Sequence, residues 1–118
     1  MTIIGILWDA GGMALSFEVY RHAAGQVLLQ LRGELDQDTA ATFHQALATA
    51  LETMPSELLL DLSMVTAVGV GGISFLMAAR RAADQLRCRF GLSAVSPAVD
   101  RQLRSRGLTS QSLEPGVH

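Results

Sequence analysis

Apolar and polar residues alternate along one early segment of the chain, and a second segment rich in strand-forming residues follows it. Every second residue is apolar in residues 14–21, and residues 27–35 form a second run rich in strand-forming residues. A period of two is typical of a strand with one buried face. The stretch "HAAGQ" between the two segments carries a turn signal. Together they predict a β-hairpin.

The period changes to that of a helix between residues 36 and 54. The apolar residues of this segment fall on one stripe: Phe43, Leu47, Ala50, Leu51 and Met54. Asp38 or Thr39 is placed to cap the N-terminus of the helix, and Pro55 ends it. His44, beside an apolar anchor, is expected to face solvent.

Residues 57–63 form a nearly continuous apolar run, which is typical of a parallel strand buried on both faces. Helical spacing returns over residues 73–86, and residues 88–95 predict a further strand. A last helix has Ser96 as N-cap, Pro97 at its first position and Gly107 beyond its end. The order ββαβαβα predicts an α/β sandwich.

The chain ends are less informative than its middle. Residues 1–12 read as an N-terminal extension or an added edge strand, residues 13–112 as one domain, and residues 113–118 as a tail. The length of 118 residues suits a single domain with its own core.

Composition excludes several classes of function. The formal charge is −2 and lysine is absent, so the basic field of a nucleic-acid-binding protein is missing. No apolar run is long enough for a membrane span and no basic secretory leader is present, which predicts a cytoplasmic protein. The single cysteine, Cys88, is expected to be a half-buried strand thiol.

The stretch "VTAVGVGGISFL" (residues 65–76) places three glycines where a strand passes into a helix. Glycines at a helix N-terminus can bind phosphate. However, the dinucleotide fingerprint would need a glycine in place of Ser74, and a P-loop needs a lysine. The histidines show no triad or metal spacing, and Asp36 and Asp38 suit capping better than acid–base catalysis. We therefore expect no catalytic site, metal or cofactor.

The helix after this loop has two predicted faces. One forms a core stripe: Phe75, Ala79, Ala82, Ala83 and Leu86. The opposite face combines Ile73, Met77, Arg80 and Asp84, flanked by Ser74 and Arg81. It is either a solvated face with two apolar residues or a partner surface, and we favour the partner surface.

Three motifs in this order resemble the STAS domain, and within it the bacterial anti-sigma factor antagonists. They are "GELD" (33–36), "LLLDLSMVTAV" (58–68) and "AVSPAVDRQLRSRGL" (94–108). The resemblance covers about residues 14–110. It implies a STAS-like sandwich: a central sheet, its first strand antiparallel and the rest largely parallel, with helices packed on it.

The resemblance also implies a function in regulation. An antagonist binds an anti-sigma factor, commonly a GHKL-type serine kinase, and so releases a sigma factor for transcription. The kinase then phosphorylates a serine in the loop before the helix and breaks the complex, because the added charge repels the partner.

This sequence departs from the family at that loop. Gly69, Val70 and Gly71 stand where the family has Asp, Ser and the phosphoacceptor Ser. Asp36, which lies near this loop in family members, is retained. Ser74 and Thr66 are the nearest hydroxyl residues that could replace the acceptor.

The leading hypothesis is a non-phosphorylatable STAS interaction module. Its partner-binding residues are the following: Asp36, Gly69, Val70, Gly71, Gly72, Ile73, Ser74, Met77, Arg80 and Arg81. A STAS accessory subunit of a transport complex and a small ligand- or nucleotide-binding STAS domain are the alternatives, and the sequence leaves a homodimer open.

Overall fold

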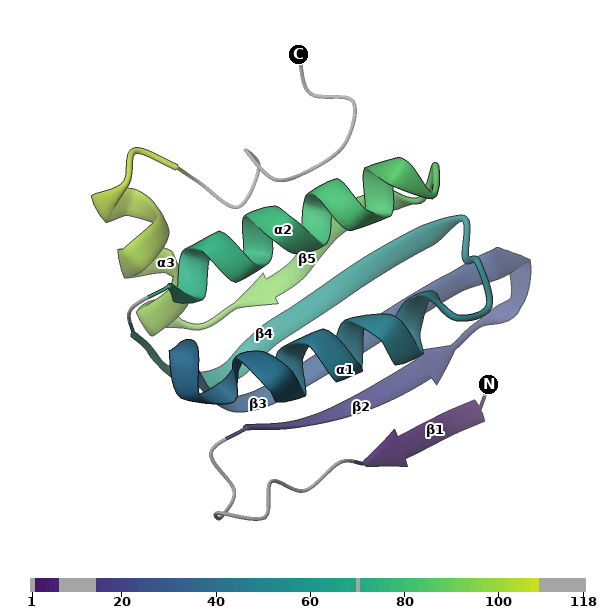
Figure 1. Ribbon diagram of the computed structural model, residues 1–118, viewed down its shortest axis with the longest axis horizontal. Coiled ribbons are helices and arrows are strands. Elements are labelled where there is room, and N and C mark those ends of the chain that lie inside the picture. Colours follow the sequence, from purple (N-terminus) through teal and green to yellow (C-terminus); the bar gives the residue numbers. More distant parts are fainter. Residues whose placement is uncertain (1, 7–14, 70, 109–118) are drawn as a thin grey trace.

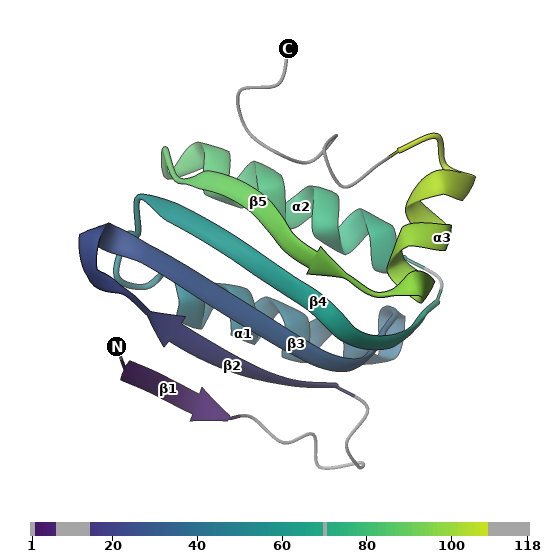
Figure 2. The same cartoon turned by 180° about the vertical axis from the view of Figure 1, so that it is seen from behind.

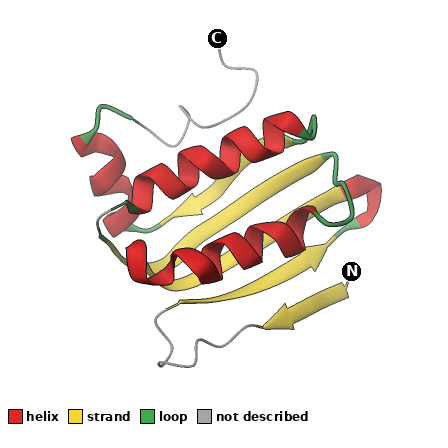
Figure 3. Cartoon of the chain, in the orientation of Figure 1, coloured by secondary structure: helices red, strands yellow, loops and turns green. Residues whose placement is uncertain are grey.

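A computed structural model describes residues 2–6, 15–69 and 71–108. Its one sheet has five strands in chain order: β1 (Thr2–Ile6), β2 (Leu15–Arg21), β3 (Gln26–Leu35), β4 (Glu57–Val68) and β5 (Arg89–Val95). The β1–β2 and β2–β3 pairs are antiparallel, and the β3–β4 and β4–β5 pairs are parallel. The helices are α1 (Ala40–Leu51), α2 (Gly72–Gln85) and α3 (Pro97–Ser105), with short 3-10 turns η1 (Ala23–Gly25) and η2 (Gln37–Thr39). The predicted α/β fold with a mixed sheet is confirmed (Figure 3).

Both crossover helices cover the same face of the sheet. Figure 1 shows α1 and α2 in front of the strands, and Figure 2 shows the opposite face without a helix over it. The cause lies in the strand order, because β3, β4 and β5 are added in one direction and right-handed crossovers then fall on one side. The prediction that β4 is buried on both faces is therefore wrong. Leu58, Leu60 and Leu62 are buried, whereas Leu59 and Asp61 between them are only partly buried.

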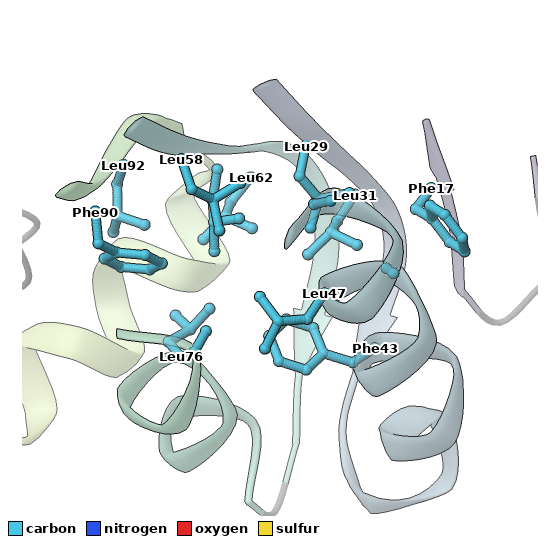
Figure 4. Packing of buried hydrophobic residues seen from close by; sticks show 14 of the residues in the cluster. Phe17, Leu29, Leu31, Phe43, Leu47, Leu58, Leu62, Leu76, Phe90 and Leu92 are labelled. Atoms are coloured by element: carbon cyan, nitrogen blue, oxygen red, sulfur yellow. The ribbon is translucent and has the colours of Figure 1, made fainter. Parts of the chain in front are cut away.

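The core lies between the helix-covered face of the sheet and the inner sides of α1 and α2. In Figure 4, Leu29, Leu31 and Leu58 point from the strands toward Phe43 and Leu47 of α1 and Leu76 of α2. Burying a side chain of this size stabilises a fold by about 1.5–3 kcal/mol. The core therefore fixes α1 and α2 against the strands. The loop between β4 and α2 thus connects two elements that are both packed in the core.

The predicted apolar stripe is confirmed for the residues that belong to α1. It is wrong for Met54, which lies beyond the end of this helix. Phe43 and Ala50 are fully buried, and Leu47 and Leu51 are 8% exposed. Met54 is 63% exposed because α1 ends at Leu51 and the backbone at Met54 has a left-handed φ of 53°. The N-cap prediction is confirmed in its position, because Thr39 is the N-cap residue of α1, but the Thr39 side chain makes no cap bond to this helix. Asp36 caps the preceding turn η2, which leads into α1.

The ends of α3 follow the predicted signals. The Ser96 Oγ accepts a hydrogen bond from the Val99 backbone N–H at 3.2 Å, and Pro97 occupies the first turn. Gly107, beyond the helix, has a left-handed φ of 73°. Cys88 is buried rather than half-buried and stands one residue before β5. No helix within the described ranges is long and apolar enough to cross a membrane.

Candidate functional site

The loop between β4 and α2 is held to the end of β3 by backbone hydrogen bonds. The Gly69 N–H donates to the Leu35 carbonyl oxygen at 2.9 Å, and the Gly72 N–H donates to the Gly69 carbonyl oxygen at 3.0 Å. Gly71 is the N-cap of α2 and has a left-handed φ of 83°. These bonds already engage the amides of Gly69 and Gly72, which a phosphate-binding loop would direct at its ligand.

Gly72 is required by close packing. A Cβ at this position would lie 2.5 Å from Val68 Cγ1 and 2.6 Å from the Leu35 carbonyl oxygen. Both distances are far below ordinary van der Waals contact. The first residue of α2 therefore fits against β3 and β4 only as glycine.

The structure brings Asp36 against the loop. A Cβ at Gly69 would lie 3.0 Å from Asp36 Cβ. The Asp36 carboxylate accepts hydrogen bonds from the backbone N–H groups of Asp38 at 2.9 Å and Thr39 at 3.2 Å, and the Asp36 N–H donates to Thr39 Oγ1 at 3.0 Å. Asp36 thus has a capping role, as the sequence predicts, and this role also fixes its carboxylate beside Gly69.

The predicted faces of α2 need a correction. Ile73 was expected on the exposed face, but it is 2% exposed and belongs to the core. The buried residues of α2 are Gly72, Ile73, Leu76, Ala79 and Ala83. Successive residues of a helix are about 100° apart around its axis. On this scale the observed buried stripe is rotated about the axis of α2 by about 60° from the predicted stripe, toward Ile73. The helix packs on β4 and β5 and also touches α1, so its buried stripe is set by several neighbours that one helical projection cannot locate.

The remaining predicted residues of α2 differ in exposure. Ser74 is exposed and its Oγ donates to the Gly71 carbonyl oxygen at 3.0 Å. Arg81 is exposed, whereas Met77 is partly buried against the core. Arg80 is partly buried, and its Nε is buried without a hydrogen-bond partner in the described part of the chain. Val70 lies outside the described residues.

Two side chains beside Gly71, and a third that packs against one of them, were not predicted for the site. A Cβ at Gly71 would lie 3.5 Å from Gln37 Cγ and 3.6 Å from Phe75 Cζ. The His44 ring of α1 meets the Phe75 ring edge-on, with centroids 6.1 Å apart. The sequence carried no signal for this group because η2, α1 and α2 meet only in the folded chain.

The site contains groups that can form hydrogen bonds, ion pairs and aromatic contacts. It offers the Ser74 hydroxyl, the Asp36 carboxylate, two aromatic rings and arginine side chains. Among the residues that the structure describes, no three His, Cys, Asp or Glu side chains lie together as a metal site would need. The Ser74 hydroxyl, the Asp36 carboxylate and the Phe75 ring lie next to the loop at the N-terminus of α2, whereas the arginines follow further along the helix.

Comparison with known proteins identifies the family. A family model described as "Mlab, STAS domain" matches residues 19–115. The chain belongs to the STAS domain family. The resemblance inferred from the three sequence motifs is therefore confirmed. No curated protein matches this STAS domain at a significant level.

Solved structures similar to this STAS domain include anti-sigma factor antagonists. One from Mycobacterium paratuberculosis is 29% identical, with 79% of this chain and 78% of that chain covered and a TM-score of 0.68. Unphosphorylated SpoIIAA is 19% identical, with coverage of 78% and 81% and a TM-score of 0.63. Phosphorylated SpoIIAA, a Bacillus cell fate determinant, is 18% identical, with coverage of 78% and 84% and a TM-score of 0.58. At these lower identities, the two SpoIIAA structures support the fold alone.

Proposed function

We propose that this STAS domain is a non-catalytic, cytoplasmic interaction module that acts as an anti-sigma factor antagonist. Its partner is an anti-sigma factor, of the GHKL serine kinase type, and its binding regulates transcription that depends on a sigma factor. The proposal is supported by the family match and by the similarity to an anti-sigma factor antagonist at 29% identity.

The proposed contact surface consists of Asp36, the loop 69–72 and the exposed part of α2. Ser74 and Arg81 offer solvent-exposed side chains there, with Met77 and Arg80 partly exposed. Ile73 supports this surface from the core and does not contact the partner itself. Gln37, Phe75 and His44 extend it onto the side of α1.

The regulatory part of the proposal is carried by Gly71, which has no hydroxyl group. The sequence resemblance aligns this residue with the phosphoacceptor of the family. The φ of 83° at Gly71 also disfavours a serine, because a left-handed backbone costs an L-residue about 1–2 kcal/mol. The antagonist would therefore bind without a covalent off-switch, and its abundance would regulate the complex.

Binding to purified anti-sigma factors encoded in the same genome tests the proposal. We expect at least one of these kinases to bind with a Kd of about 1 μM or below, measured by biolayer interferometry. Mg-ATP should leave the complex intact, and mass spectrometry should find no phosphate on this chain. Failure of every anti-sigma factor to bind, or loss of the complex through phosphorylation of this chain, would overturn the proposal.

Two exposed hydroxyl residues form a matched pair for locating the surface. Ser74 Oγ donates to the Gly71 carbonyl oxygen at 3.0 Å, and Thr53 Oγ1, after the end of α1, accepts a hydrogen bond from Arg21 Nη1 at 2.8 Å. Ser74→Tyr should weaken binding roughly tenfold or more because it places a bulky ring in the contact. Thr53→Tyr, which lies outside both the loop surface and α2, should leave the affinity within about twofold of wild type. Equal effects of both variants would place the contact elsewhere.

A triple substitution tests whether the acceptor alone is missing. Gly69→Asp, Val70→Ser and Gly71→Ser together should create a site that a bound kinase phosphorylates, detected by radiolabelled ATP. The same triple variant with Gly71→Ala instead of Gly71→Ser is the control, and it should remain unlabelled. Labelling of the control at Ser74 or Thr66 would show that one of these hydroxyls serves as the acceptor.

A second candidate function is a constitutive accessory subunit of a transport complex. The absence of a hydroxyl at Gly71 favours it, since such a subunit needs no phosphorylation switch. Stoichiometric co-purification of a transport ATPase with the endogenous protein, without any anti-sigma factor, would favour this function over the first.

A further inference from the structure

Charged residues are divided unequally along the chain. Residues 15–79 contain seven acidic residues and two arginines, whereas residues 80–108 contain seven arginines and two acidic residues, Asp84 and Asp100. The formal charge of −2 for the whole chain conceals this division. Residues 15–79 therefore carry a formal charge of −5 (two minus seven) and residues 80–108 a formal charge of +5 (seven minus two).

The fold turns most of this division along the sequence into a division in space; the exception is Glu57 at the start of β4, which is the register partner of Arg89 on β5. The strands lie in the sheet in their chain order, so the last elements occupy one side of the molecule. Figures 1 and 2 both show β5 at the sheet edge opposite β1, with α2 beside it and α3 at the end where α2 begins. The acidic residues occupy β2, β3, the turn η2, the region after α1 and the start of β4.

Six of the seven late arginines make no ion pair with an acidic residue in the described part of the chain. Only Arg104 does, with its Nε 3.0 Å from the Asp100 carboxylate. We call the other six the arginine flank: Arg80, Arg81, Arg87, Arg89, Arg101 and Arg106. Five of them are exposed, and the partly buried Arg80 has a buried Nε without a hydrogen-bond partner in those ranges.

We propose that the arginine flank docks onto an acidic surface of the protein partner. This inference rests on the proposed function, because Arg80 and Arg81 of α2 belong to both the loop surface and the flank. Guanidinium groups suit carboxylates, since their planar fork donates two parallel hydrogen bonds. The recognition surface of the partner would thus contact the loop, and carboxylates of the partner would contact the arginine flank.

The charge division favours a protein partner over a nucleic acid. A long polyanion that bound the flank would extend past it and meet the field of the seven acidic residues on the remaining domain. A folded partner can contact one side only. In such a complex, exposed arginines mainly accelerate association by steering, an effect that salt screens.

The test uses a hexaglutamate peptide as the probe, because it is only about 20 Å long when extended and can stay within the flank. Binding is followed by fluorescence anisotropy in salt of about 20 mM. Arg101→Glu on α3 and Arg32→Glu on β3 are matched variants, because both arginines are exposed and both changes alter the net charge equally. We expect Arg81→Glu with Arg101→Glu to weaken peptide binding about tenfold, Arg101→Glu alone about threefold, and Arg32→Glu less than twofold. Circular dichroism melts confirm that each variant is folded.

Three outcomes would overturn this inference. They are equal weakening by Arg32→Glu, tighter binding of a duplex DNA than of the peptide at the same salt, and a salt-sensitive dimer of the chain that Arg101→Glu abolishes. The first would show an effect of net charge alone, the second a phosphate partner, and the third a second copy on the flank. The peptide experiment needs no anti-sigma factor, so it fails separately from the proposed function.

Discussion

Replacing Gly72 by alanine adds a methyl group where the backbone leaves no room for it. The new Cβ would lie 2.5 Å from Val68 Cγ1 and 2.6 Å from the Leu35 carbonyl oxygen. Carbon atoms pack at about 3.5–4.0 Å, so α2 and β3 must separate by roughly 1 Å. The Val68 side chain can rotate, but the Leu35 carbonyl belongs to a central strand and also accepts the Gly69 amide.

The expected loss of stability follows from two opposing terms. Overpacking of this kind costs about 3 kcal/mol at the upper end of its usual range. Alanine is a better helix former than glycine, which returns at most about 1 kcal/mol. The free energy of unfolding of Gly72→Ala should therefore fall by about 2 kcal/mol, which corresponds to a decrease in Tm of about 10 °C.

Urea denaturation followed by circular dichroism measures this loss, with an unchanged m-value showing that the unfolding reaction is the same. Gly107→Ala is the matched control, because a Cβ at Gly107 meets no atom within 4 Å and only its φ of 73° resists the change. It should lose about 1 kcal/mol. If Gly72→Ala proves as stable as Gly107→Ala or more so, the close approach of α2 to β3 is wrong.

Further predictions concern charge and the thiol. Burial raises the pKa of Asp61, but the hydrogen bonds that its carboxylate accepts lower it by more. The pKa of Asp61 therefore lies below the usual range of an aspartate. The stability that this lowered pKa contributes is present above the ordinary pKa of aspartate and is lost as the pH falls through the pKa of Asp61 in the folded protein. Ser63→Ala removes a hydroxyl that lies 2.7 Å from the Asp61 carboxylate, so it should raise the pKa of Asp61 in an NMR titration. Gly69→Asp should unfold at lower urea than Gly69→Asn at low salt, because its carboxylate lies beside Asp36, and the difference should shrink at high salt. Burial raises the pKa of the Cys88 thiol, so Ellman's reagent should modify it slowly in the native protein and fully in denaturant.

The sequence predicted the ends of an element well where those ends depend on a few neighbouring residues. Ser96, Pro97 and Gly107 marked the ends of α3 correctly, because capping and left-handed φ are properties of a few consecutive residues. The family resemblance added the directions of the strands in the sheet, which the pattern of single segments could not supply.

Positions that depend on several elements were predicted less well. Ile73 was placed on the exposed face of α2, although the combined packing of strands and α1 buries it. Leu59 was expected to be buried on a doubly covered strand, but the strand order puts both crossover helices on one face. The contact of Asp36 with Gly69 joins residues 33 positions apart and could be expected only from the family resemblance, not from spacing.

The sheet order of this domain also bears on how the chain folds during synthesis. Each strand pairs with the one made just before it, so no strand must wait for a later segment to be inserted between itself and its neighbour. Loops that close over short sequence distances form faster than long-range ones. We expect the sheet to grow from β1 toward β5 as the chain leaves the ribosome, with the arginine-rich elements added last.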